Sequence, residues 1–146
     1  MDDRMLSEAT VRVGAAFAGK DEAIRACGEL LRAAGHVSPE YIEKMVERDN
    51  LSTTYVGSGV AVPHGTKASI DFVKSTGLAV VQVPAGVDFG KGNIAYLLVA
   101  IAAKGDEHID ILTEIASICA DDERLEGLLK AGTARDIIAL IGGAGA

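Results

Sequence analysis

The apolar residues of the N-terminal third recur every three or four positions, a spacing that is typical of amphipathic helices. It predicts a first helix over residues 21–34, which Gly35 ends because glycine readily adopts the conformation that follows a helix. A second helix is predicted to begin at Ser38-Pro39-Glu40, where the serine can cap the helix and the proline fits its first turn. This helix runs to Arg48, and the polar residues that follow are expected to close it.

Continuous apolar runs in the middle of the chain predict strands that are buried on both faces of a sheet. The two long runs are 77–83 and 94–102, and shorter strands are predicted at 10–13 and 60–62. Such strands need helices on both sides, and the pattern supplies them at 107–120, at 123–130 and after a Thr133-Ala-Arg-Asp136 capping box. The sequence therefore predicts an α/β layered fold and, since no linker or repeat divides it, one domain over residues 1–146.

Composition and charge narrow the classes of function. The 146 residues include 14 Lys and Arg against 21 Asp and Glu, which gives a net charge of −7. This acidic balance, with no Trp and only three Phe and three Tyr, disfavours nucleic acid as a partner. The longest apolar run, 94–103, is about half of a membrane span, and no leader segment is recognised at the N-terminus. We expect a cytoplasmic protein without direct membrane insertion.

The number and spacing of the two cysteines agree with a cytoplasmic location. Cys27 and Cys119 have no metal-ligand spacing, and both fall on apolar faces of predicted helices. A small secreted scaffold would carry far more cysteines, so a reducing environment is expected. We interpret both residues as core side chains rather than reactive thiols.

His64 is the first candidate functional residue. It follows the predicted strand 60–62 in phase with the apolar residues of that strand, Pro63 stiffens the approach, and Gly65 lets the backbone turn away. These features predict an imidazole at the mouth of the sheet, where α/β folds bind ligands. The alternative is an ordinary histidine in a turn, since one histidine in such a loop is a weak signal.

Arg48 is the second candidate, because it occupies the apolar stripe of the predicted second helix. It lies seven residues after Tyr41 and three after Met45, which puts all three on one helical face. A guanidinium on an apolar face is a fixed positive charge, which suggests that it binds an anion. The alternative is a cation near a helix C-terminus that satisfies the last carbonyl groups.

His108 is the third candidate, placed in the first turn of the helix that follows the buried strand 94–102. It heads the same stripe as Leu112 and Ile115, and the free N–H groups of a helix start can hold a phosphate. The helix dipole there favours a neutral imidazole. The alternative is a half-buried histidine with a satisfied hydrogen bond.

Together the three candidates suggest a shallow anionic site suited to phosphoryl transfer, in which catalysis is mostly positioning and electrostatic stabilisation. Neutral imidazole is a competent nucleophile near pH 7. A zinc site built from His64, His108 and an acid such as Asp106 remains an alternative, although no short-range ligand pair anchors it. His36 follows Gly35 with no apolar stripe behind it, and we interpret it as a surface residue.

At these residues the chain resembles the enzyme IIA domains of the mannitol/fructose class of the bacterial phosphoenolpyruvate-dependent sugar phosphotransferase system. The signature is Gly59-Val-Ala-Val-Pro63-His64-Gly65-Thr66. The supporting stretches are Lys20-Asp-Glu-Ala-Ile-Arg25 with Gly28, Val37-Ser-Pro39-Glu40-Tyr41 leading to Glu47-Arg48, and Ile101-Ala-Ala103 followed by Glu107-His108-Ile109. They extend in order from about residue 20 to residue 120. Tyr41, Glu47-Arg48 and Glu107-His108 are more similar to mannitol-specific members than to fructose-specific or nitrogen-regulatory ones.

The resemblance implies a mixed β-sheet sandwiched between helices and a phosphocarrier that needs no cofactor or metal. In the family, the histidine that matches His64 is phosphorylated by the phosphohistidine of HPr and passes the group to a cysteine of enzyme IIB. The positions that match Arg48 and His108 line that active site and stabilise the phosphoryl group. No IIB or IIC segment is recognised, so a free-standing IIA subunit of a mannitol-type permease is expected.

Three alternatives to a carrier for mannitol uptake stay open at this point. A regulatory IIA-like protein would use the same phosphohistidine as a switch on partner proteins. A fructose-class IIA would serve a different permease, and the short Gly90-Lys-Gly-Asn93 loop leaves the sugar assignment open. A metal-dependent hydrolase would use His64 and His108 as zinc ligands.

Overall fold

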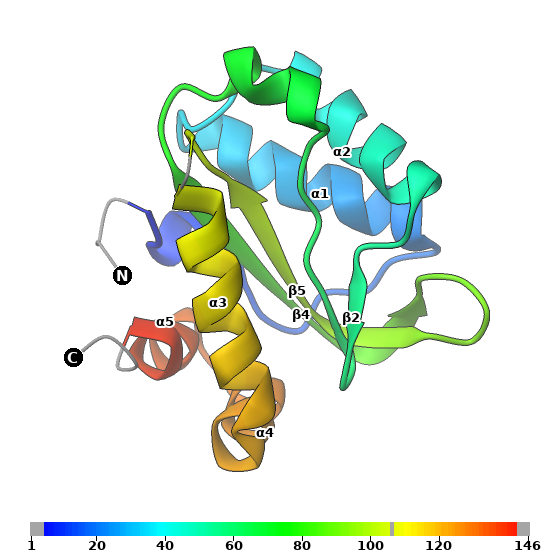
Figure 1. The fold of residues 1–146 in the computed structure, drawn as a ribbon. Helices are drawn as coiled ribbons and strands as arrows, with labels where there is room; N and C mark the ends of the chain where they lie inside the picture. The colour runs from blue at the N-terminus through cyan, green and yellow to red at the C-terminus, as the bar shows by residue number, and fades with distance from the viewer. Residues whose placement is uncertain (1–4, 106, 143–146) are drawn as a thin grey trace.

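The computed structural model describes residues 5–105 and 107–142 and consists of one sheet with helices on both faces (Figure 1). The strands are β1 (Val11–Arg12), β2 (Tyr55–Gly57), β3 (Val60–Ala61), β4 (Gly77–Asp88) and β5 (Ile94–Ala102). The α-helices are α1 (Lys20–Ala33), α2 (Glu40–Leu51), α3 (Glu107–Ala120), α4 (Asp122–Lys130) and α5 (Ala134–Gly142). Two 3₁₀ helices, η1 (Glu8–Thr10) and η2 (Lys67–Phe72), complete the elements of the described residues.

The sheet is mixed, as the resemblance implied. Its strand order is β1-β4-β5-β3-β2. β1 runs parallel to β4 and β3 runs parallel to β5, whereas β4 pairs antiparallel with β5 and β2 antiparallel with β3. The long β4–β5 pair forms the centre, and the short β3 lies along the outer edge of β5. This arrangement brings the end of β3, and the residues after it, beside the end of β5.

Over residues 78–83 of β4, successive side chains point to opposite faces of the sheet and are buried on both, which confirms the interpretation of this apolar run. Ala79 and Val81 pack with α1 and α2, whereas Leu78 and Val80 pack with α3, α4 and α5. Figure 1 shows α1 and α2 on one side of the sheet and α3, α4 and α5 on the other. Within residues 5–105 and 107–142, no helix has the length and apolar character needed to cross a membrane.

The helices follow the predicted pattern closely, and the differences are local. Gly35 adopts a φ of 85° directly after the first helix, as expected for a helix-ending glycine. The predicted serine cap of α2 is wrong, because the buried Ser38 hydroxyl has no hydrogen-bond partner and Pro39 occupies the cap position. Thr133 does cap α5, since its hydroxyl accepts a hydrogen bond from the Asp136 N–H. β2 and η2 were not predicted.

His36 is buried, with 6% of its surface exposed, so the prediction of a surface residue is wrong. Its ring lies flat against the backbone of Gly77, where an added Cβ would come within 2.3 Å of the imidazole. The ring Nδ1 lies 2.9 Å from the Ser75 hydroxyl, and the His36 carbonyl accepts the N–H groups of Lys74 and Ser75. The local sequence contains no sign of this burial, because the covering residues lie about forty positions further along the chain.

Burial lowers the pKa of His36, which makes folding sensitive to acid. The unfolded chain binds this proton at a higher pH than the folded protein does, so stability is lost as the pH falls below about 6.5. We therefore expect His36→Phe to reduce the loss of unfolding free energy between about pH 7 and pH 5, as measured by urea unfolding. An unchanged pH dependence in the variant would contradict this expectation.

Candidate functional site

A cavity of about 560 Å³ opens where β3 and β5 end, and it contains the three candidate residues. Its walls come from α2, from the segment after β3, from η2 and from the start of α3. The lining includes Tyr41, Arg48, His64, Ser69, His108 and Ile109. Residues that are far apart in the sequence therefore meet in one cavity, as the stripe positions of Arg48 and His108 predicted.

His64 is held at the edge of the sheet by the segment that continues β3. The Ile101 N–H donates to the Pro63 carbonyl at 2.9 Å, and His64 forms an isolated parallel bridge with Ile101 of β5. The His64 Nδ1 lies 2.8 Å from the Val62 carbonyl oxygen. A carbonyl oxygen can only accept, so Nδ1 carries the proton and, in the neutral ring, Nε2 carries the free lone pair.

Tyr41 fixes the turn that follows His64, a role that the sequence did not reveal. Its buried hydroxyl donates to the Ile101 carbonyl at 2.9 Å and accepts the Gly65 N–H at 2.9 Å. Burial raises the pKa of Tyr41, which keeps the hydroxyl protonated and able to donate. Tyr41 therefore ties the turn to β5 through its hydroxyl group.

Gly65 is required here for a different reason from the one expected. Its φ is not in the left-handed region. Instead, an added Cβ would lie 2.5 Å from both the Tyr41 ring and the Ser69 hydroxyl. The glycine allows the turn to approach Tyr41 closely, and that approach makes the hydrogen bond between them possible.

His108 faces His64 from the first turn of α3. The two ring centroids are 5.1 Å apart and the ring planes are inclined at 85°, so the imidazoles meet edge to face. His108 is half-buried and heads the helix whose inner face contains Ile111 and Ile115. Its place on the apolar stripe therefore puts a polar ring at the cavity, as the spacing predicted.

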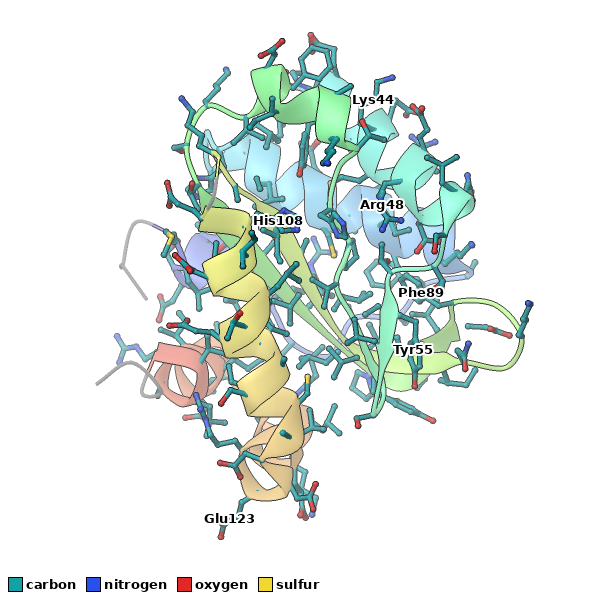
Figure 2. The ribbon with its side chains drawn as sticks, viewed as in Figure 1. Lys44, Arg48, Tyr55, Phe89, His108 and Glu123 are labelled. Atoms are coloured by element: carbon teal, nitrogen blue, oxygen red, sulfur yellow. The ribbon has the colours of Figure 1, made fainter. Side chains whose placement is uncertain are left out.

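Arg48 lies across the cavity from His108, on α2. Figure 2 shows the two side chains on either side of the segment that follows β3. The Arg48 guanidinium donates to the Ser52 carbonyl at 2.7 Å, so it satisfies the end of its own helix while it lines the cavity. The interpretation as a cation that satisfies the helix C-terminus is thus confirmed. Binding of an anion stays a prediction, for which the remaining guanidinium donors are available.

The electrostatics of the cavity favour neutral imidazoles. Burial is the main cause that lowers the pKa of His64, and the nearby His108 and Arg48 lower it further. The hydrogen bond to Val62 and the charge of Asp49 act in the opposite direction. Burial and the Arg48 charge also lower the pKa of His108. Near pH 7, the cavity therefore presents two uncharged rings together with the cationic side chains of Arg48 and Lys67.

The described residues give no support to a zinc site. No group of three or more His, Cys, Asp or Glu side chains in this part of the chain is arranged to hold a metal ion. Asp106, the acid that the zinc alternative invoked, lies outside the described residues. The two histidines alone would leave a tetrahedral zinc ion short of protein ligands.

Two parts of the cavity wall were not predicted from the sequence. η2 contributes Ser69 and the exposed Ile70, yet its mixed residues show no clear helical period. Tyr41 has a visible position on the stripe of Arg48, but its second hydrogen bond depends on the tertiary approach of Gly65. A polar tip on a largely apolar stripe was the one signal that could have indicated this role.

The chain belongs to the family described as phosphoenolpyruvate-dependent sugar phosphotransferase system, EIIA 2, whose model matches residues 4–143. Among curated relatives, it is 42% identical over 137 residues to the mannitol-specific phosphotransferase enzyme IIA component of Geobacillus stearothermophilus, covering 94% of each chain.

Solved structures agree with this membership. The crystal structure of IIA mannitol from Escherichia coli matches with a TM-score of 0.86 and 38% identity, covering 93% of this chain and 98% of that one. The IIA protein in the complex of enzyme IIAMTL with phosphorylated enzyme IIBMTL from Escherichia coli matches with a TM-score of 0.89 and 37% identity. That match covers 94% of this chain and 97% of the other. The predicted fold and the mannitol-like resemblance are confirmed.

The hydroxyl of Tyr41 is expected to contribute measurably to stability. Tyr41→Phe leaves the Gly65 N–H and the Ile101 carbonyl without this partner, which we expect to lower the free energy of unfolding by about 1–3 kcal/mol. Urea unfolding measures the change. Tyr96→Phe is the matched control, because the Tyr96 ring is 39% exposed, and equal stability of the two variants would contradict the assignment.

The charge of Arg48 is expected to contribute to the lowered pKa values of both cavity histidines, beside the larger effect of burial. Arg48→Gln removes the cation that lowers the pKa of His64 and of His108, so both pKa values should rise. Titration of the ring protons by NMR measures the shifts. Arg25→Gln serves as the control, because Arg25 pairs with Glu43 on the exposed surface, and a fall or no change after Arg48→Gln would refute the expectation.

Proposed function

We propose that this chain is a phosphoryl carrier that takes a phosphoryl group onto His64 from phosphorylated HPr and passes it to the cysteine of a mannitol-type enzyme IIB. The observation that carries the proposal is the hydrogen bond from His64 Nδ1 to the Val62 carbonyl. It leaves Nε2 as the free nitrogen of a ring that lines the cavity. Membership of the EIIA 2 family and similarity to mannitol-specific relatives support the same conclusion.

Two balanced steps describe the transfer. In the first, the Nε2 lone pair attacks phosphorus while the donor's N–P bond breaks, and the electron pair of that bond returns to the donor ring. In the second, the cysteine thiolate attacks phosphorus, a P–S bond forms, and His64 leaves as a neutral imidazole. Nδ1 keeps its proton throughout, because the Val62 carbonyl holds it.

Arg48 and His108 are proposed to stabilise the phosphoryl group in both steps. The Arg48 guanidinium supplies fixed positive charge beside the equatorial oxygens, where negative charge spreads in the transition state. His108, edge to face with His64, can donate a hydrogen bond from its ring to the same oxygens. Neither residue has to move far, since both line the cavity.

Apolar side chains at the rim support docking of protein partners. Ile70 on η2 is 46% exposed and Ile109 on α3 is 65% exposed, and both line the cavity. A partner that covers them would bury apolar surface and exclude water around the transferred group. The Escherichia coli relative is known in a complex with phosphorylated IIB, which supports an enzyme IIB as the acceptor.

We also propose that residues 1–146 form a single IIA domain that acts in the cytoplasm. The family model spans nearly all of these residues, and the relative from Geobacillus stearothermophilus matches over a similar length. A phosphohistidine carrier needs contact with partners on the side of the membrane where phosphoenolpyruvate is made.

The carrier function predicts an acid-labile phosphate on His64. Incubation with phosphoenolpyruvate, enzyme I and HPr should label the wild-type protein, and mannitol IIB should then remove the label. His64→Ala should take up no label, whereas His108→Ala and Arg48→Ala should fold and transfer about a hundredfold more slowly, since each removes one stabilising group. Mass spectrometry and rapid-quench assays measure both effects.

The outcomes separate the competing functions. Label that persists in His64→Ala would refute the assignment of the nucleophile. A labelled wild-type protein that fails to transfer to any sugar-specific IIB would instead support a regulatory switch. His36→Phe is the control for loss of a histidine remote from the cavity lining, and its transfer rate should match that of the wild type.

A further inference from the structure

A buried carboxylate lies beneath the cavity and has no part in the proposed chemistry. Asp49 is only 2% exposed, although it stands next to Arg48 in the last turns of α2, and it does not line the cavity. Removing a carboxylate from water is costly unless charges and hydrogen bonds compensate it. The contacts of Asp49 therefore show which groups compensate the cost of burying its carboxylate.

Asp49 joins three separate segments of the chain. Its Oδ1 accepts the Thr54 N–H at 2.9 Å and the Thr54 hydroxyl at 2.7 Å. Its Oδ2 makes no hydrogen bond but lies 2.9 Å from the Lys20 Nζ, at the start of α1. We call Lys20, Asp49 and Thr54 the Asp49 cluster. This cluster clamps the turn after α2 against the N-terminus of α1.

The clamped turn leads directly to the nucleophile. The Thr54 carbonyl accepts the Val62 N–H at 2.9 Å. The Val62 carbonyl in turn accepts the His64 Nδ1–H at 2.8 Å. The N–H and the carbonyl group of Val62 are thus both hydrogen-bonded, and Thr54 holds the residue whose carbonyl orients His64.

The same turn also holds the Arg48 guanidinium, which lines the cavity. Arg48 donates to the Ser52 carbonyl at 2.7 Å, two residues before Thr54. A shift of residues 52–54 would therefore move the partner of Arg48 and the partner of Val62 together. A neutral, solvent-exposed turn could connect α2 to β2 without a buried ion pair, so connection alone does not explain the Asp49 cluster.

We propose that Asp49 is a positioning residue, which, together with Lys20, holds Thr54 so that the Val62 carbonyl fixes the His64 ring in the tautomer with Nε2 free. This inference rests on the proposed function, in which Nε2 is the nucleophile. The Asp49 cluster acts through the Thr54 and Val62 peptides and never touches the phosphoryl group.

The His64 tautomer is the readout that a merely structural role would not change. The ¹⁵N shifts of the imidazole at a pH above its titration identify which nitrogen bears the proton. Removing the Asp49 charge would by itself lower the pKa of His64, because that charge raises it, so a change in the titration midpoint would not separate positioning from charge. The unphosphorylated protein suffices, which keeps the measurement independent of transfer.

Asp49→Asn is the main variant, because it preserves size while it removes the ion pair with Lys20. We expect the His64 ring to populate both tautomers and the rate of phosphoryl uptake from HPr to fall at least about tenfold, since small misplacements of a reacting group are costly. Glu47→Gln is the matched control on the same helix. Its exposed carboxylate pairs with Lys44, and the variant should keep the wild-type tautomer and rate.

Each outcome decides the question. A folded Asp49→Asn protein with the wild-type tautomer and rate overturns the proposal, even if its melting temperature falls. Where Asp49→Asn does not unfold cooperatively, Thr54→Val and Thr54→Ser decide instead. Thr54→Val should shift the tautomer and slow uptake, and Thr54→Ser should restore both, because only the serine keeps a hydroxyl for Asp49. Wild-type behaviour of Thr54→Val then overturns the proposal. A wild-type protein that takes up no phosphate refutes the carrier function instead.

Discussion

The site depends on one hydrogen bond, from the His64 Nδ1 to the Val62 carbonyl two residues earlier. An imidazole in a turn can rotate and exchange tautomers, and either freedom would move the lone pair away from the position that the proposed transfer requires. The surrounding structure restricts both. The Pro63 segment pairs with β5, Tyr41 holds the turn beyond the ring, and the Thr54 carbonyl fixes the Val62 peptide. Together these contacts hold the His64 ring in one position, with the lone pair on Nε2.

Much of this architecture is visible in the sequence, because burial on both faces of β4 and β5 demands continuous apolar runs. Arg48 and His108 were singled out because each is a polar residue on an apolar stripe, and both line the cavity. β2 was missed because Gly57, Ser58 and Gly59 form a turn with positive φ at each residue, which leaves a strand too short to show a period. Sequence pattern therefore locates elements better than it locates their edges.

What the sequence could not predict depends on contacts between distant segments. His36 can be buried because its ring packs directly against the backbone of Gly77, where a side chain would leave no room. The two residues are far apart in the sequence, so no local pattern predicts this contact. Gly65 was correctly singled out, but for freedom of turning rather than for the closeness of Tyr41. The pairing of Lys20 with Asp49 likewise joins two helices. The spacing of Asp49 from Met45 places it on the buried face of α2, but no local pattern identifies Lys20 as its partner.

The cavity is much larger than a single phosphoryl group, and its rim is partly apolar. Between encounters, a phosphorylated imidazole here would remain hydrated, and its N–P bond would be open to slow hydrolysis. Docking would seal the same space with the partner's side chains. The fraction of phosphate lost to hydrolysis would then depend on how soon the phosphorylated protein meets a partner. When partners are scarce, more of the phosphate would be lost to water before transfer.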